Sequence, residues 1–343
     1  MRRVSTIAMV GLLCTLSFVG LAQTRRRTTT PAPAPTPPAP KQWAPPKTAD
    51  GNPDLQGYWT NVTLTPLQRP ANLANKEFFT PAEAAEYEKQ IVNQNNADRR
   101  DGTAVQDVSR AYNDFWWDRG TKVVKTLRTS LIIDPPDGRI PALVPAANQR
   151  LAARRQAVAG RAMDGPEFRP LAERCILWAT AGPPMMPSFY NNNYHIVQNA
   201  GFVTILVEMI HDARIIPTDN RPHLPETVRQ WLGNSVGHWD GNTLVVETTN
   251  FTDKNPFQNS SKDMKLTERF TRTDPDTLMY EFTVDDPATY TRPWTAQIPM
   301  SKTEGPVWEY ACHEGNYAMT NVLSGARAEE KAAAEAAAKG ASR

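Results

Sequence analysis

The chain has 343 residues, with 38 lysine and arginine residues against 36 aspartate and glutamate residues, so its formal net charge is only +2. A chain with so little basic excess is a poor candidate for binding nucleic acid or an acidic surface. The sequence contains no phosphate-binding glycine loop, no dinucleotide fingerprint and no Gly-x-Ser-x-Gly motif, which disfavours nucleotide chemistry and serine esterases.

The first 22 residues are typical of a secretory signal peptide. Arg2 and Arg3 supply the positive start, and residues 7–21 form an apolar stretch too short to favour a transmembrane helix. Gly20 and Ala22 place small residues where a signal peptidase requires them. We therefore expect an exported protein, periplasmic or extracellular, with a formal charge of zero and no transmembrane helix after cleavage. An uncleaved anchor is the alternative.

Three further regions follow the signal peptide. Residues 23–50 are expected to form a disordered linker, because a chain rich in proline and threonine stays extended and buries little. Residues 51–327 are long enough for a single β-rich globular domain. Residues 328–343 are rich in alanine, glutamate and lysine, which favour helix locally. They carry no apolar face, so we expect a loose tail.

The helices expected in the domain fall mainly in its first half. Thr80 and Glu83 form a capping box with proline at the first helical position, which predicts a helix running to about Gln94. A second helix is expected over residues 148–158. A short third helix is expected over residues 226–232.

Several segments show the alternation or the short apolar run that is typical of β-strands. They are residues 57–64, 130–133, 202–209, 243–248, 265–271, 278–284, 295–300 and 307–312. The later segments follow one another across turns, which predicts an antiparallel meander. A sheet with one apolar face must close or be covered. We therefore expect a mainly β fold in which the meander forms a lipocalin-like barrel or a strongly curved sheet.

Two cysteines remain after Cys14 leaves with the signal peptide. Cys175 and Cys312 would lie in an oxidising compartment, so we expect them to form a disulfide. Free thiols or metal-binding cysteines are the alternatives. A disulfide brings its two Cα atoms to about 5–6 Å, so it also brings together the residues on either side of each cysteine.

The expected bridge would gather Glu173, Arg174, His313 and Glu314 in one place. Histidine and carboxylate groups held together are suited to acid–base catalysis. We therefore predict His313 and Glu314 as catalytic residues and Arg174 as a ligand-binding residue. The alternative is a structural ion pair between Arg174 and Glu314 beside the bridge.

Glu208 and His211 form a second candidate pair, at the end of an apolar strand. A buried carboxylate has a raised pKa and can act as an acid or base near neutrality, so both residues are predicted to be catalytic. The alternative is an ion pair at the strand end, in which Glu208 or Asp212 contacts Arg214.

The segment from Tyr190 to His195 is rich in asparagine and aromatic residues, as is the neighbourhood of Tyr317. Amides and tyrosine rings suit a sugar or polyol, so Tyr190, Asn192, His195 and Tyr317 are predicted to bind ligand. A plain turn is the alternative, because asparagine tolerates left-handed backbone.

Metal binding has little support in the spacing of the histidines. The sequence has no HExxH or paired-histidine motif, so we expect no metal and no cofactor. If a metal were bound, its ligands would come from His195, His211 and His313.

Two short motifs resemble the opening of lipocalin strands: Gly57 with Trp59, and Gly237 with Trp239, each in a Gly-x-Trp pattern. The resemblance implies a calyx that holds a small or elongated apolar ligand. The chain as a whole also resembles an uncharacterised family of secreted bacterial proteins. The stretches that carry this resemblance are residues 128–130, 134–139, 208–214, 241–251 and 310–317.

These features favour an exported protein that binds a small molecule, apolar or sugar-like, and no nucleic acid. One alternative is an exported enzyme that acts on a carbohydrate or related small molecule by acid–base or metal-assisted chemistry. Another is an envelope-attached structural protein, which the proline-rich linker would suit. If the candidate histidines and carboxylates converge on one cleft, the enzyme alternative gains support.

Overall fold

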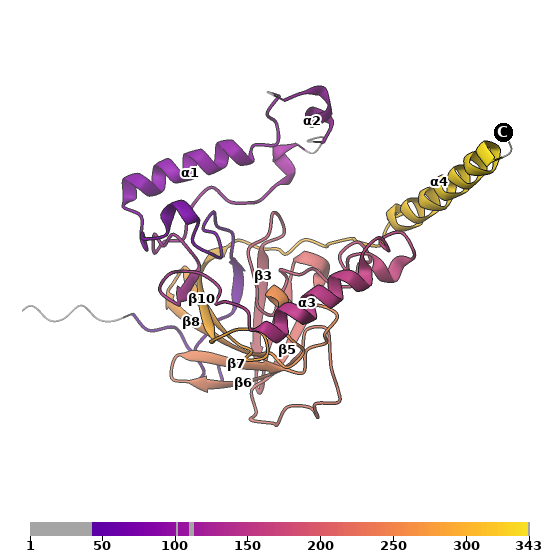
Figure 1. Cartoon of the computed structure of the whole chain (residues 1–343). Helices are drawn as coiled ribbons and strands as arrows, with labels where there is room; N and C mark the ends of the chain where they lie inside the picture. The colour runs from indigo at the N-terminus through magenta and orange to yellow at the C-terminus, as the bar shows by residue number, and fades with distance from the viewer. Residues whose placement is uncertain (1–42, 101, 110–112, 342–343) are drawn as a thin grey trace, which may run out of the picture. The chain divides into compact units, whose positions relative to one another are not determined.

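The computed structural model describes residues 43–100, 102–109 and 113–341 (Figure 1). The expected signal peptide and most of the expected linker lie outside these residues. The helices are α1 (Pro81–Asn95), α2 (Ala104–Ser109), α3 (Pro145–Val158) and α4 (Ala318–Ala341). The strands are β1 (Gly57–Thr60), β2 (Ile132–Asp134), β3 (Asn193–Asn199), β4 (Phe202–Val207), β5 (Ala213–Pro217), β6 (Asn234–Asp240), β7 (Thr243–Thr249), β8 (Lys265–Asp274), β9 (Thr277–Asp285) and β10 (Trp294–Thr303).

The strands form one antiparallel sheet in the order β5-β4-β3-β1-β10-β9-β8-β7-β6, with the short β2 paired to β10. The predicted meander is confirmed, because β7 pairs with β8, β8 with β9 and β9 with β10. The prediction of a mainly β fold with few helices is also confirmed. In the described part of the chain, the edge strands β5 and β6 share no backbone ladder, so the sheet is not closed into a barrel.

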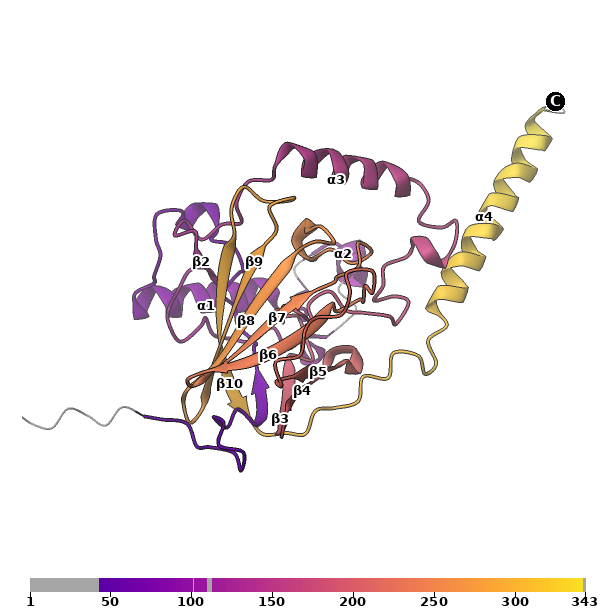
Figure 2. The ribbon, with the colours of Figure 1, turned by 90° about the horizontal axis from the view of Figure 1, so that it is seen from below.

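The sheet is strongly curved (Figure 2). Five strands lie between β5 and β8 in the sheet, which would separate these two strands by roughly 29 Å in a flat sheet with about 4.8 Å between neighbours. Nevertheless, Nη2 of Arg214 on β5 lies 2.5 Å from Oε2 of Glu268 on β8. The sheet therefore bends until its distant strands face each other across the concave side.

The concave face of the sheet holds the main hydrophobic core. In β9, the alternate residues Leu278, Tyr280, Phe282 and Val284 are fully buried, as the sequence pattern predicted. The other large, fully buried side chains of this core include Trp59, Tyr194, Phe270 and Trp294. These large side chains fill the space between the facing strands.

The prediction of a strand at residues 307–312 is wrong. This segment pairs with no described strand. The backbone N–H of Trp308 instead donates to Oε1 of Glu208 at 3.0 Å, and Cys312 is covalently bound to Cys175. The run of apolar and aromatic residues was misleading because a side chain and a disulfide, rather than a neighbouring strand, hold the segment.

The prediction of a helix at residues 226–232 is also wrong, since these residues form turns. The side-chain amide of Asn250 donates to the carbonyls of Leu224, Pro225 and Val228, at 2.9, 3.0 and 3.2 Å. Asn250 directly follows β7. Its side chain binds these carbonyls in place of the backbone hydrogen bonds that a helix would form.

The C-terminal region forms the long helix α4, in which no residue is buried. The alanine-rich tail is therefore helical, and the helix begins before the predicted start of the tail at residue 328. The Nη2 atom of Arg327 donates to the carbonyl of Met163 at 2.8 Å, which connects α4 to the segment after α3. None of the helices in the described residues is both long enough and apolar enough to cross a bilayer.

The helix α1 begins at the predicted capping box, which is confirmed. The hydroxyl of Thr80 accepts from the backbone N–H of Glu83 at 3.3 Å, and the Glu83 carboxylate accepts from the Thr80 N–H at 2.8 Å. A small second core, separate from the main one, packs Ala84 of α1 against Phe79 and Val123.

We expect Thr80→Ala to destabilise the protein by about 1 kcal/mol, because the first turn of α1 then loses its side-chain acceptor. Thr80→Ser keeps the hydroxyl and should lie within about 0.5 kcal/mol of the wild type. Urea unfolding followed by circular dichroism measures both changes. Equal losses in the two variants would show that the hydroxyl does not cap the helix.

Candidate functional site

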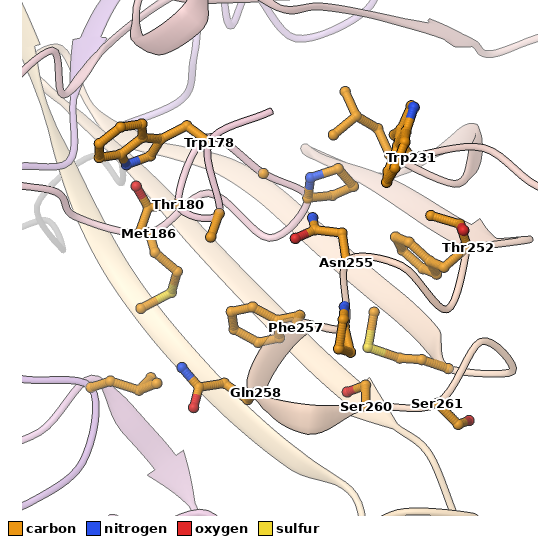
Figure 3. A pocket seen from close by; sticks show the side chains of 18 of the residues that line it. Trp178, Thr180, Met186, Trp231, Thr252, Asn255, Phe257, Gln258, Ser260 and Ser261 are labelled. Atoms are coloured by element: carbon orange, nitrogen blue, oxygen red, sulfur yellow. The ribbon is translucent and has the colours of Figure 1, made fainter. Parts of the chain in front are cut away.

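A cavity of about 290 Å³ lies beside the core, where β7 ends and β8 begins (Figure 3). Apart from Leu67, its lining comes from three segments that are distant in sequence. These are residues 178–187, 231–232 and 251–264. Trp178, Met186, Trp231 and Phe257 surround the cavity. A concave, mostly apolar site with a few polar groups is the usual form of a small-molecule site.

The first wall of the cavity is a tight loop, residues 178–187, in which Gly182 has a φ of +107°. A Cβ at this position would lie 2.7 Å from Cγ of Met185. Both the positive φ and this close approach therefore require glycine. The backbone N–H of Met185 donates to the hydroxyl of Tyr280 on β9 at 3.0 Å. This bond anchors the loop to the interior of the sheet.

The anchor continues into a buried polar network. The Tyr280 hydroxyl donates to Oε1 of Glu268 at 2.7 Å, and Arg214 contacts both carboxylate oxygens, at 3.0 and 2.5 Å. Arg214 thus pairs with Glu268, rather than with Glu208 or Asp212 as the sequence alternative proposed. Its carboxylate partner lies on β8, so the network ties together β5, β8 and β9.

The network is electrostatically fixed near neutral pH. Burial, together with the charge of Glu268, raises the pKa of Tyr280 well above its usual value, so the phenol stays protonated and donates. Burial acts to lower the pKa of Arg214, but the facing Glu268 carboxylate outweighs it and raises that pKa. The network therefore supports the first wall.

The second wall is the turn at Phe257–Asn259, between β7 and β8. Gln258 and Asn259 have left-handed backbone, with φ of 47° and 72°. The ring of Phe257 stacks on Trp294 with 6.0 Å between centroids, and the Tyr290 hydroxyl donates to the Gln258 carbonyl at 2.5 Å. Non-glycine residues in this region carry a conformational cost and cluster at functional sites. The core thus holds this wall in a shape that the local sequence does not favour.

A second cavity, of about 410 Å³, adjoins the first and shares Trp178, Thr180 and Met186 with it. The Oγ1 atom of Thr180 is buried and has no hydrogen-bond partner among the described residues. A buried hydroxyl without a partner carries an energetic cost. Phe189 and Arg119 also line the second cavity.

The predicted disulfide is confirmed. The sulfur atoms of Cys175 and Cys312 are bonded, with 5.7 Å between their Cα atoms. The bridge closes a long loop, with a separation of 137 residues between the cysteines.

The disulfide places three of the four predicted neighbours around one cavity, of about 350 Å³: Glu173, Arg174 and His313. Glu314 is exposed and is not part of this lining. Glu173 forms an ion pair with Arg169, with 2.7 Å between Oε2 and Nη2. The alternative ion pair between Arg174 and Glu314 is not formed among the described residues.

Glu208 is buried, with 2% of its surface exposed. Its Oε2 accepts from the amide of Asn193 at 2.7 Å, and its Oε1 accepts from the backbone N–H of Trp308 at 3.0 Å. The Glu208 carboxylate thus connects β3 to the segment after β10, with one oxygen bonded to each. The side chain of His211, the other member of the predicted pair, is outside what the structure describes.

The predicted ligand-binding segment at Tyr190 to His195 is only partly a loop, because β3 begins at Asn193. Asn192 is buried. Its Oδ1 accepts from the Ser188 N–H at 2.7 Å and its Nδ2 donates to the Asp118 carbonyl at 2.7 Å. The ring of Tyr190 lies 6.2 Å from that of Trp178, measured between centroids, and Trp178 lines the candidate cavity.

The remaining candidates have different surroundings. His195 stacks on Tyr58 of the neighbouring β1, with 4.2 Å between ring centroids, whereas His313 lies beside the disulfide. Tyr317 is exposed. Among the described residues, no group of three or more histidine, cysteine or carboxylate side chains is arranged to hold a metal ion.

Sequence reasoning did not single out the residues that line the cavity, namely Trp178, Trp231 and Phe257. Each lies in a turn-rich segment, where an aromatic residue carries no periodic signal. The one available signal was the proline-rich run from Gly182 to Pro187, which contains two methionines. Apolar side chains in a segment that cannot form a strand or helix often line a pocket.

Comparisons of this chain with protein-family models, with curated proteins and with solved structures find no match.

Proposed function

We propose that this chain is an exported protein that binds a small, largely apolar molecule in the cavity between Trp178 and Phe257. The observation that carries the proposal is the preformed shape of both walls. One wall is fixed through Met185 and Tyr280, and the other through Tyr290. Preformed apolar cavities bind with less loss of conformational freedom than flexible ones.

Two observations support the exported location. The N-terminal sequence has the pattern of a secretory signal, and the disulfide between Cys175 and Cys312 is of a kind that persists in oxidising compartments. The proposed use of the sheet is lipocalin-like in one respect, because a curved antiparallel sheet supports the ligand site. The ligand would lie at the margin of the core, since aromatic side chains fill the concave face.

We expect the purified protein to bind N-phenyl-1-naphthylamine, an uncharged probe whose fluorescence increases in apolar surroundings. Phe257→Ala should weaken this binding about tenfold, or about 1.4 kcal/mol, because the probe loses an aromatic wall. Fluorescence titration measures the change.

The matched control is Phe115→Ala, which removes a ring that is 84% exposed and does not line the cavity. It should leave the affinity unchanged. Thermal melting of each variant checks that the fold is intact. If the probe does not bind, or if both variants bind it as the wild type does, the cavity is not the binding site.

A further inference from the structure

A fourth cavity, of about 800 Å³, adjoins the candidate site. Four residues line both cavities: Ala179, Trp231, Asn255 and Pro256. Trp231 is 36% exposed, so its indole offers an accessible stacking surface between the two spaces. Asn255 lies between Trp231 and Phe257 (Figure 3). A ligand seated against Phe257 can therefore extend into the fourth cavity.

The fourth cavity has a strong excess of positive charge. Its charged lining consists of Arg154, Arg169, Arg174, Lys254 and Glu167. Arg169 is neutralised by an ion pair outside this lining, with Glu173. Arg154, Arg174 and Lys254 form no ion pair with any residue that the structure describes. The cavity thus presents three uncompensated cations against one carboxylate.

The cations come from separate elements that converge here. Arg154 lies on α3, Arg174 immediately precedes Cys175 of the disulfide, and Lys254 lies in the connection between β7 and β8. Like charges held near one another repel, and a bound anion relieves that repulsion. A concave surface of one sign also concentrates ligands of the opposite sign. This arrangement is suited to an acidic group at one end of the ligand.

We propose that the ligand is a compact amphipathic anion. Its apolar body lies between Trp178 and Phe257, and its acidic group lies against Arg154 and Lys254. This inference rests on the proposed function, because it names the chemical class of the molecule that the candidate site binds. The amide of Asn255, at the boundary between the two cavities, is placed to donate to the acidic group.

The test compares two probes with the same ring system. N-phenyl-1-naphthylamine is uncharged, and 8-anilino-1-naphthalenesulfonate carries one additional sulfonate. At an ionic strength of about 0.01 M, where the Debye length is about 30 Å, the anionic probe should bind the purified protein roughly tenfold more tightly than the neutral probe does. At about 1 M, where the Debye length is about 3 Å, this preference should be largely lost.

The double variant Arg154→Gln/Lys254→Gln should weaken binding of the anionic probe about tenfold and leave binding of the neutral probe unchanged. The matched control is Arg155→Gln/Lys302→Gln. It removes the same formal charge from two exposed residues that do not line the cavity. One of them, Arg155, directly follows Arg154 on α3. The control should leave both affinities unchanged.

The outcomes separate the two proposals. If both probes bind equally and the double variant affects neither, the anion inference is wrong and the binding function stands. If the control weakens the anion as much as the cavity variant does, the preference reflects overall charge and the inference is again wrong. If neither probe binds, the proposed function itself fails.

Discussion

Replacing Glu268 by alanine is expected to destabilise the fold by about 3–5 kcal/mol. The side chains of Arg214 and Glu268 are 3% and 0% exposed, so the substitution leaves the guanidinium buried without its partner. The Tyr280 hydroxyl also loses its acceptor. Urea unfolding at neutral pH measures the loss.

Two comparisons test the cause of this effect. Arg214→Met/Glu268→Leu removes both charges and should be considerably less destabilised than Glu268→Ala, because no buried charge is left unpaired. Arg292→Ala breaks the pair with Asp134, in which the two side chains are 50% and 49% exposed, and should cost less than about 1 kcal/mol. A Glu268→Ala loss as small as that of Arg292→Ala would contradict the buried-network account.

Removing the disulfide should cost about 5 kcal/mol if chain entropy dominates, since the bridge restricts a loop with a separation of 137 residues in the unfolded state. Cys175→Ala/Cys312→Ala is the appropriate variant, because alanine leaves no free thiol. Each single variant should lose a comparable amount, because the bond requires both cysteines. The shift of the urea midpoint, measured without reductant, reports the loss.

A reductant provides the control for this prediction. It should destabilise the wild type to the level of the double variant and leave the double variant unchanged. The bridge also holds the segment after β10, which Glu208 fixes at a second point through Trp308. If reduction does not change the unfolding midpoint, the bridge does not contribute to the stability of the folded chain.

The parts of the fold that the sequence predicted are those with a local physical signal. The strands β8 and β9 alternate buried and partly buried residues over most of their length, and α1 has its capping box. The disulfide followed from the number of cysteines left in an oxidising compartment. Each of these signals depends on a few neighbouring residues or on a simple count.

The strands that were missed depend on long-range pairing. β3 contains Asn193, His195 and Asn199, residue types that are poor strand formers, and its beginning was read as a loop. It is a strand because it pairs on both sides, with β1 and with β4. No local window of the sequence contains that information.

The candidate site was missed for the same reason. Its walls lie on the loop at residues 178–187 and on the turn at Phe257–Asn259, which the chain order does not bring together. They meet because Tyr280 on β9 holds one wall and Tyr290, just before β10, holds the other. The aromatic residues are visible in the sequence, but the distances between them are not. The predicted cluster at the disulfide was found because a covalent bond fixes that distance.

A crystal structure of the protein saturated with N-phenyl-1-naphthylamine would show whether the cavity between Trp178 and Phe257 is a ligand site. We expect density for the naphthyl ring between these two side chains, with little movement of either wall because both are preformed. If the probe lies at another surface and this cavity is empty at saturation, the cavity is not the ligand site.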